Sequence, residues 1–442
     1  MFSCHYYKLT LKLLYHKAKE TFLHILIIGG GGREHSIAWA VKQNPKCRKL
    51  SCSPGNAGIA KIANCIQINI NDGNIVKNWC TNNNVDLVII GPEEPLANGV
   101  SDILNNAGIL TFGPSLEASK LESSKLFTKE ICSLCEAPTA KYNHFENQNS
   151  ALSFIQMAKY PLVIKADGLA AGKGVVIVYT PLEATKALKD MFGGHYGDGG
   201  AEVVIEEFMD GEEVSLFVLC DGKNIIPLGS AQDHKRAYDG DKGPNTGGMG
   251  AYSPAPILTK EIEEKAISKI IKPCLNEMKK RGSPYKGVLY AGLMIKNFEP
   301  KLVEFNARFG DPECQVLMMR LGGQILDLII ATCEKRLNEV SVVWANDHAL
   351  AVVIAANGYP NKYIKGSKIL GYNNIEEDST KMLFHAGTKK DGNNIISNGG
   401  RVLNVTARGS SLQDAKIRAY KMIEKIDWKD GFYRKDIGWR AL

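Results

Sequence analysis

The feature that most restricts the fold of this chain is a short apolar run that ends in four glycines. Residues 25–28 read Ile-Leu-Ile-Ile, Gly29 to Gly32 follow, and a helical stretch continues through Val41. A continuous apolar run is typical of a parallel strand that is buried on both faces, and the glycine turn leads into a covering helix. The chain is therefore predicted to open with a doubly wound α/β domain.

The same turn lacks the two marks of a dinucleotide-binding site. Glu34 occupies the third glycine position of the G-x-G-x-x-G pattern. The acid that such sites carry about twenty residues further on is missing from residues 50–56. An NAD-dependent dehydrogenase is therefore not favoured.

A second apolar run, residues 85–90, leads into Gly91, Pro92 and Glu93. Ligands bind where the strands of a parallel sheet end, so we expect Arg33 and Glu93 to share one crevice. Gly-Pro is also ordinary turn chemistry, which makes this loop weak evidence when taken alone.

Composition excludes several classes of protein. The 442 residues are 44% hydrophobic and 23% charged, which is typical of two to four globular domains. The net charge of +7 has no clustered basic block behind it, so we expect anionic small molecules as ligands and no nucleic acid. No apolar run approaches the roughly eighteen residues that a membrane span needs, and we expect no membrane partner.

The cysteines indicate a reducing compartment. Eleven of them occur at irregular spacing, which is typical of free thiols in a cytoplasmic protein. Only Cys132 and Cys135 form a C-x-x-C pair, in an expected helix over 124–135. No second pair completes a zinc site, so we expect neither metal nor redox use.

A glycine-rich loop separates two apolar strands in the middle of the chain. The strands are expected over 162–165 and 175–179, and the loop between them reads Ala-Asp-Gly-Leu-Ala-Ala-Gly-Lys-Gly. Such a loop can fold over phosphates and present backbone N–H groups, with Lys165 and Lys173 adding positive charge. It is not a Walker A loop, because Gly174 follows the lysine where serine or threonine is required.

Three further stretches complete the central region. A strand over 202–205 leads into five acids between Glu206 and Glu213, which in this setting indicate a nucleotide hinge rather than a solvated turn. The polar, glycine-rich stretch over 230–252 has no periodicity and predicts a long functional loop. Residues 259–281 form an amphipathic pattern that predicts a helix, kinked or stopped near Pro273.

The polar face of the next expected strand suits a metal ion and phosphates. Over residues 303–308, apolar side chains alternate with Glu304, Asn306 and Arg308. Magnesium prefers oxygen ligands from one or two side chains together with phosphates and water, and a guanidinium can neutralise a transferring phosphoryl group. By itself the alternation fits an edge strand with a solvated face equally well.

The rest of the chain predicts a third region. A helix is expected over 317–336, short strands over 349–356, 369–371, 383–385 and 401–407, and a closing helix over 411–426. The resulting fold class is multidomain α/β. We expect a disordered extension over 1–23 and a substrate-binding α/β domain over 24–122. A central domain is expected over 123–335, with a mobile subdomain at about 145–213, and a small barrel-like α/β domain over 336–442.

The combination of glycine loop, acidic hinge and E-x-N-x-R strand resembles the ATP-grasp superfamily, and more closely the phosphoribosylamine-glycine ligase family. The resemblance covers residues 24 to 442. The segments that carry it are 31–35, 91–93, 165–174, 232–236, 246–254, 304–313 and 434–441.

The resemblance implies that ATP, glycine and 5-phosphoribosylamine give glycinamide ribonucleotide, ADP and phosphate through a glycyl phosphate. It implies catalytic roles for Arg308 and Lys165, and Mg²⁺ or Mn²⁺ held by Glu304 and Asn306. The implied ATP-binding residues are Lys125, Lys165, Gly172, Lys173, Glu206, Glu207, Phe208, Met209 and Glu213. Among them the resemblance implies that residues 206–209 contact adenine, largely through their backbone, and that Glu213 contacts the ribose hydroxyls. The implied substrate-binding residues are Gly31, Arg33, Glu93, Asp233, Lys235, Arg308 and Asp311.

The resemblance also leaves choices open. Another ATP-grasp ligase or a biotin-dependent carboxylase is the alternative, and the segments at 232–236 and 245–254 argue against it. The strand over 292–295 lacks the carboxylate that many ATP-grasp enzymes place before the metal strand, which leaves the second metal position incomplete. A monomer in the cytoplasm is expected, with loop 168–174 closing over ATP because an acyl phosphate must be kept from water.

Overall fold

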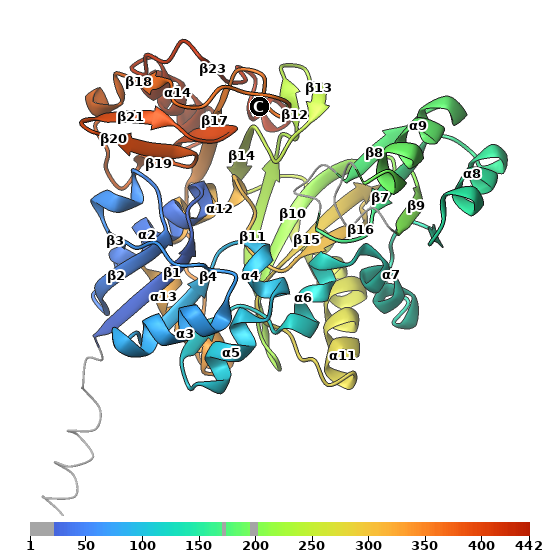
Figure 1. Cartoon of the computed structure of the whole chain (residues 1–442), viewed down its shortest axis with the longest axis horizontal. Coiled ribbons are helices and arrows are strands. Elements are labelled where there is room, and N and C mark those ends of the chain that lie inside the picture. The colour runs from blue at the N-terminus through green and yellow to red at the C-terminus, as the bar shows by residue number, and fades with distance from the viewer. Residues whose placement is uncertain (1–21, 170–173, 195–201) are drawn as a thin grey trace, which may run out of the picture.

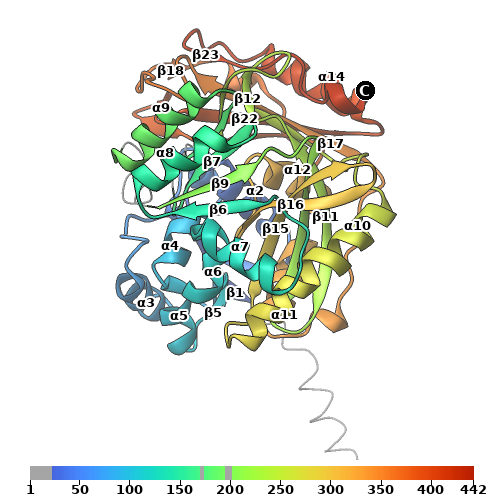
Figure 2. The same ribbon diagram turned by 90° about the vertical axis from the view of Figure 1, so that its right-hand side faces the viewer.

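The computed structural model describes residues 22–169, 174–194 and 202–442. The expected extension over 1–23 thus lies almost wholly outside the described residues. Figure 1 shows three regions that surround a common centre: a blue N-terminal domain, a green subdomain with its own small sheet, and a red C-terminal region. Figure 2 gives the view turned by 90°, with the red C-terminal region at the top.

The N-terminal domain is a five-stranded parallel sheet in the order β3-β2-β1-β4-β5. Ile25 and Ile27 of β1 pack in one hydrophobic core, whereas Leu26 and Ile28 pack in another on the opposite face. This burial on both faces confirms the prediction of a doubly wound domain. Its elements are β1 Leu23–Gly29, α2 Gly32–Lys42, β2 Cys47–Pro54, β3 Asn64–Cys65, α3 Gly73–Asn82, β4 Leu87–Ile90, α4 Glu93–Ala97, α5 Val100–Asn106 and β5 Leu110–Phe112.

A small four-stranded sheet forms the green subdomain, in the order β6-β9-β7-β8. Strands β7 and β8 are antiparallel and are joined by the glycine loop, as predicted. Helices α8 and α9 cover one face and share a core with β7 and β9. The elements of this region are α6 Leu116–Ser123, α7 Lys125–Leu134, β6 Tyr142–Phe145, α8 Gln148–Met157, β7 Leu162–Ala166, β8 Val175–Val178, α9 Pro181–Phe192 and β9 Val203–Glu207.

The large sheet runs through the central and C-terminal regions without interruption. Its order is β16-β15-β10-β11-β14-β17-β22-β19, and β23 pairs with β17. The strands of the C-terminal region therefore continue the sheet of the central region through the β14–β17 pair. The strands are β10 Glu212–Asp221, β11 Ile225–Asp233, β14 Gly250–Ser253, β15 Lys286–Lys296, β16 Glu299–Asn306, β17 His348–Ala356, β19 Lys381–His385, β22 Arg401–Gly409 and β23 Gly431–Phe432.

Smaller elements complete the chain. A hairpin and a separate three-stranded sheet stand beside the large sheet, and the expected kinked helix is interrupted by a π-helix just before Pro273. These elements are β12 Arg236–Tyr238, β13 Lys242–Asn245, α10 Lys260–Ala266, the π-helix Ile267–Ile271, α11 Lys272–Lys280, β18 Lys368–Ile369, β20 Thr388–Asp391, β21 Asn394–Ser397 and α14 Leu412–Ile423.

The long loop that we expected over residues 230–252 is wrong, because this stretch contains the end of β11 together with β12, β13 and β14. Backbone pairing, rather than a side-chain pattern, holds it in place. A Cβ atom on Gly250 would lie 2.7 Å from the carbonyl oxygen of Ala351 in β17. Glycine therefore permits two strands to approach closely here and does not mark a loop.

The single helix that we expected over residues 317–336 is also wrong. Two helices, α12 Glu313–Leu321 and α13 Gln324–Cys333, meet at an angle of 105°. Gly322 adopts a φ of 58° at the end of α12, a conformation that ends helices and that glycine adopts readily. In the described part of the chain no single helix has the length and apolarity to cross a membrane, and only this bent pair together meets those criteria.

Candidate active site

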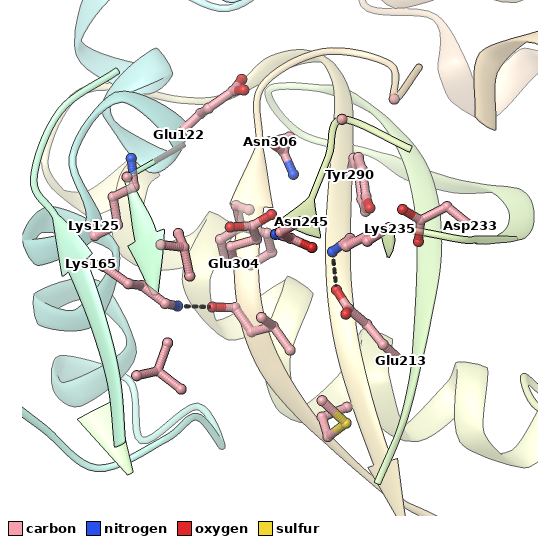
Figure 3. Close-up of a pocket in the computed structure, with 18 of the residues that line it drawn as sticks. Glu122, Lys125, Lys165, Glu213, Asp233, Lys235, Asn245, Tyr290, Glu304 and Asn306 are labelled. Carbon is pink, nitrogen blue, oxygen red and sulfur yellow. Dashed lines mark hydrogen bonds and ion pairs between the residues drawn. The ribbon is translucent and has the colours of Figure 1, made fainter. Parts of the chain in front are cut away.

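The three regions converge on one cleft of about 910 Å³. Figure 3 shows Lys125 and Lys165 on one side of it, Glu304 and Asn306 near the middle, and Asp233, Lys235 and Glu213 on the other side. Of the predicted site residues that the structure describes, only Gly31 does not line this cleft. Gly172 and Lys173 lie outside the described residues.

Strand β16 supplies the polar centre of the cleft. Phe305 and Ala307 pack in the hydrophobic core, while Glu304 and Asn306 point into the cleft (Figure 3). Burial alone would raise the pKa of the Glu304 carboxyl, but nearby positive charges, above all Lys235 and Lys165, lower its pKa. Glu304 is therefore an ionised carboxylate surrounded by cations.

Glu206 joins two buried lysines on the side of the cleft that is formed by the small sheet. Its Oε1 lies 2.9 Å from Nζ of Lys165 and 3.2 Å from Nζ of Lys129, and all three side chains are almost fully buried. Lys165 also donates a hydrogen bond to the carbonyl oxygen of Val303. The resemblance implied an adenine contact for Glu206 largely through its backbone, and the structure adds that its side chain anchors Lys165.

Asp167 links the glycine-loop strand to the start of helix α7. Its carboxylate accepts hydrogen bonds from the backbone N–H groups of Lys125 and Leu126, at 2.5 and 3.0 Å, and from the Ser124 hydroxyl. The Nζ of Lys125 in turn donates to the carbonyl oxygen of Gly168. Burial lowers the pKa of Lys125. These contacts hold Lys125 beside Gly168 at the edge of the cleft.

The far side of the cleft carries a second charged group. Lys235 forms an ion pair with Glu213, and the neighbouring carboxylates raise the pKa of Lys235 against the opposing effect of burial. Burial also raises the pKa of Asp233 to about 7, with Lys235 opposing the rise and Glu313 adding to it. Glu213, implied as a ribose contact, therefore has a side-chain partner within the protein.

Arg33 and Arg308 meet three carboxylates at the mouth of the N-terminal domain. Arg308 contacts Glu93 through Nε at 3.2 Å and Glu122 through a terminal nitrogen at 2.7 Å. Arg33 lies 3.9 Å from the same Glu93 carboxylate and 2.8 Å from Glu34. The expected crevice shared by Arg33 and Glu93 is thus confirmed, and Arg308 belongs to it as well.

The ionisation of Glu93 should make the free energy of unfolding depend on pH. Although burial opposes the shift, Arg308 and Arg33 lower the pKa of Glu93 from 4.5 to about 2. A carboxyl with a lowered pKa in the folded state stabilises the fold above its unfolded pKa, and this contribution is lost as pH falls from about 4.5 to about 2. We expect Glu93→Gln to lower the free energy of unfolding at pH 7 by about 2 kcal/mol, after allowance for partial exposure, and by almost nothing near pH 2.

Denaturant unfolding at a series of pH values measures this difference. Glu94→Gln is the matched control, because Glu94 is the next residue in the chain and is exposed. If Glu93→Gln lowers the free energy of unfolding equally at pH 7 and near pH 2, the lowered pKa of Glu93 is contradicted.

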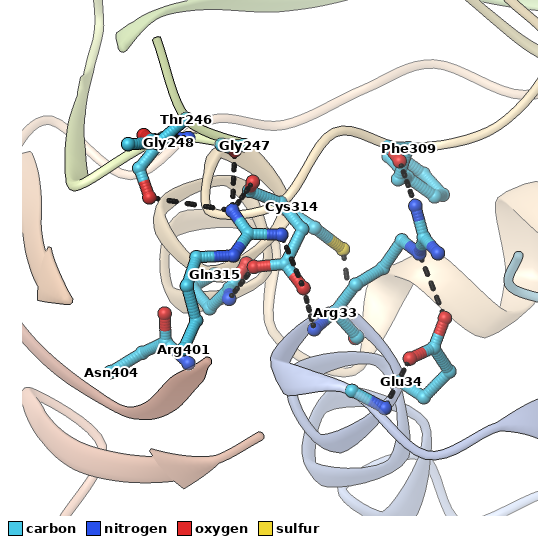
Figure 4. A network of polar contacts seen from close by, with 12 residues as sticks. Arg33, Glu34, Thr246, Gly247, Gly248, Phe309, Cys314, Gln315, Arg401 and Asn404 are labelled. Carbon is cyan, nitrogen blue, oxygen red and sulfur yellow. Dashed lines mark hydrogen bonds and ion pairs between the residues drawn. The ribbon is translucent and has the colours of Figure 1, made fainter. Parts of the chain in front are cut away.

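Arg401, from β22 of the C-terminal region, completes the cleft. Its guanidinium donates hydrogen bonds to the carbonyl oxygens of Gly247 and Asp311, as Figure 4 shows. The Asp311 carboxylate accepts a hydrogen bond from Gln315 at 2.8 Å and a long one from the backbone N–H of Arg33 at 3.4 Å. The N-terminal domain, the central region and the C-terminal region are therefore joined at Asp311.

Sequence reasoning missed several polar residues of the cleft, among them Glu122, Lys129 and Arg401. For Lys129 a signal was present, because it follows Lys125 by four residues and so lies on the same face of α7. For Glu122 and Arg401, the neighbouring residues in the sequence form no motif that would indicate a functional polar residue. Only the assembled fold brings them to Arg308 and Asp311.

The donor set on β16 fits a hard divalent cation that is shared with phosphates. Within residues 22–169, 174–194 and 202–442, no three His, Cys, Asp or Glu side chains group as a metal site. The oxygen donors that β16 directs into the cleft are one carboxylate, Glu304, and one amide oxygen, Asn306. Magnesium-type cations take one or two protein oxygens and complete their shell with phosphates and water, whereas zinc sites need three or four protein ligands.

Three family models match the chain in order. They are described as the N domain, the ATP-grasp (A) domain and the C domain of phosphoribosylglycinamide synthetase, and they match residues 23–122, 123–314 and 349–440. A phosphoribosylamine--glycine ligase of Brucella melitensis is 49% identical, over 95% of this chain and 98% of that protein. The chloroplastic phosphoribosylamine--glycine ligase of Arabidopsis thaliana is 51% identical, over 93% of this chain and 79% of that protein.

Solved structures agree with this result. The crystal structure of phosphoribosylamine--glycine ligase from Thermotoga maritima has a TM-score of 0.82 and 30% identity, and the match covers 94% of this chain and 100% of that one. A biotin carboxylase from Campylobacter jejuni, at 15% identity and a TM-score of 0.72 over 94% of each chain, shares the fold alone. The chain belongs to the phosphoribosylglycinamide synthetase family of ATP-grasp enzymes, which are also named phosphoribosylamine--glycine ligases.

Proposed function

We propose that this chain ligates glycine to 5-phosphoribosylamine at the expense of ATP and so forms glycinamide ribonucleotide, ADP and phosphate. The observation that carries the proposal is the single cleft in which an E-x-N-x-R strand faces buried lysines on one side and the N-terminal crevice on the other. Such a cleft can hold a nucleotide and a small anionic substrate at the same time.

In this proposal the nucleotide lies between the small sheet and β16. The hinge residues 206–209 contact adenine, and Lys125 and Lys165 neutralise the phosphates. Glu206, which is also paired with Lys129, holds Lys165 in place, so that the Lys165 ammonium group is oriented before ATP arrives. Mg²⁺, or Mn²⁺ in its place, is held by Glu304 and Asn306, and when bound it neutralises charge on the phosphate oxygens.

Arg308 acts where the glycine carboxylate meets the γ-phosphate. Its guanidinium carries a full positive charge, which stabilises the charge that develops on the transferring phosphoryl group. Two carboxylates fix its orientation, Glu93 and Glu122. The amine of phosphoribosylamine then displaces phosphate from the glycyl phosphate.

The amine substrate enters from the N-terminal crevice. We assign its binding to residues around the join of the three regions, since their charges and donors suit a sugar phosphate with several hydroxyl groups. These residues are Gly31, Arg33, Glu93, Asp233, Lys235, Arg308 and Asp311. Glu213 contacts the ATP ribose through the carboxylate oxygen that does not take part in its ion pair with Lys235.

The proposed setting is a monomer in a reducing compartment such as the cytoplasm. The ten cysteines within the described residues are free thiols, which is the state expected in such a compartment.

Omission of single components tests the function. We expect purified protein with magnesium, ATP, glycine and freshly generated phosphoribosylamine to release ADP, and release to stop when any one component is left out. ADP formation with bicarbonate in place of glycine would support the carboxylase alternative, whose members share only the fold with this chain. ADP formation without phosphoribosylamine would contradict the proposed second step.

A further inference from the structure

Three cysteines converge where helix α7 meets helix α11. The Sγ of Cys135 lies 3.6 Å from the Sγ of Cys274, and the Sγ of Cys132 lies 4.0 Å from it. Figure 2 shows the two helices side by side. The C-x-x-C pair alone led us to expect no redox use, but the third thiol, distant in the sequence, changes that expectation.

The three thiols differ in their access to solvent. Cys132 and Cys274 are fully buried, whereas Cys135, at the end of α7, is partly exposed. The thiol of Cys274 holds the pKa of Cys135 at about 7 through a hydrogen bond, which outweighs the effect of burial. An oxidant from solvent therefore meets Cys135 first, and much of that thiol is in the reactive thiolate form at neutral pH.

A metal site explains the cluster less well. The described residues contain no group of three Cys, His, Asp or Glu side chains that could hold a metal ion. Two adjacent thiols on separate helices, one of them reachable from solvent, are instead the arrangement of an attacked and a resolving cysteine.

We propose that Cys135 and Cys274 form an oxidation site that responds to peroxide. The Cys135 thiolate attacks one oxygen of hydrogen peroxide and, with one proton taken up, gives a sulfenic acid and water. The thiol of Cys274 then attacks the sulfenic sulfur, and a disulfide and a second water form. The two sulfurs lose two electrons in total, and both oxygens of the peroxide leave as water.

The disulfide would act on the nucleotide side of the cleft. A disulfide requires its sulfurs to lie about 2.05 Å apart, so the end of α7 must move toward α11 or both side chains must turn. Helix α7 carries Lys125 and Lys129, and the chain continues from it into β6 of the small sheet. On the basis of the proposed function, we expect the crosslinked protein to turn over ATP more slowly and to recover after reduction.

Mass spectrometry tests the linkage without any assay of activity. The full chain is reduced, treated with hydrogen peroxide, blocked with N-ethylmaleimide and digested. We expect a Cys135–Cys274 peptide pair that dithiothreitol separates, its absence in Cys135→Ser, and its retention in Cys132→Ser. Cys65→Ser is the matched control, because Cys65 is another partly exposed cysteine outside the cluster, and its linkage should equal that of the wild type.

Several results would overturn the proposal. A Cys132–Cys274 pair, a Cys135 sulfinic acid without linkage, or unreacted thiols would each contradict the oxidation site. Unchanged ATP turnover in fully linked protein would contradict its effect on the cleft. If the reduced protein shows no ligation, the proposed function fails, while the peptide analysis still decides on the linkage.

Discussion

Arg308→Lys is expected to lower kcat by about 10²- to 10³-fold, the loss typical of removing one donor from a transition-state charge site. The guanidinium contacts Glu93 and Glu122 on different nitrogens while facing the cleft. Lysine keeps the charge but presents a compact ammonium group that cannot bridge two carboxylates and a phosphoryl group together. The loss should therefore fall on kcat more than on the KM for ATP. Steady-state ADP release measures both.

The control for this variant is Arg336→Lys, because Arg336 also bridges two carboxylates, Glu334 and Glu339, but on the surface. Its kcat should equal that of the wild type. The retained charge should keep the Arg308→Lys protein folded, which circular dichroism checks. A kcat within about threefold of the wild type would show that Arg308 binds the ground state and the transition state equally, or only supports the structure, and does not stabilise the transition state specifically.

Glu304→Gln is expected to cost about 10³-fold in kcat/KM for metal-bound ATP, since the metal supplies several kcal/mol of charge stabilisation. Glutamine keeps the size of the side chain and removes the charge that attracts the cation. The metal concentration for half-maximal activity should rise. In the presence of a chelator, ATP should bind the variant as tightly as the wild type or more tightly, because a negative charge beside the polyphosphate has been removed. Calorimetric titration of ATP, once with metal and once with chelator, measures both affinities.

Glu299→Gln provides a matched control on the same strand. Glu299 is exposed on β16 and pairs with Lys265 and Lys269, away from the cleft. Its metal dependence should be that of the wild type. Weaker ATP binding by Glu304→Gln in the chelator would indicate a structural role for the carboxylate and contradict metal binding.

The parts of the fold that could be predicted are those in which one segment determines its own structure. The apolar run 25–28 is buried on both faces in any parallel sheet, and the glycines after it must turn. Strand β16 likewise reveals its two faces through alternation. Between Ser230 and Tyr252, by contrast, β12 and β13 pair with each other and β14 pairs with β11 and β17. Such backbone pairing leaves no pattern in the side chains.

The candidate site divides in the same way. Glu304, Asn306 and Lys165 could be found because their neighbours in the chain carry the motif. Glu122 and Arg401 could not, because their roles arise from contacts with Arg308 and Asp311, far away in the chain. The same reason hid the thiol cluster, whose third member, Cys274, follows the C-x-x-C pair at a long distance in the sequence.

The continuity of the large sheet has a consequence for synthesis of the chain on the ribosome. Strand β14, Gly250–Ser253, pairs on one side with β11 and on the other with β17, which begins only at His348. At the usual rate of translation this partner follows roughly 5 to 20 s later. During that interval one edge of β14 has no partner, and an unpaired edge is a template for another chain. Stalled ribosomes in this window would therefore release products prone to aggregate, whereas a completed chain closes the edge with its own β17.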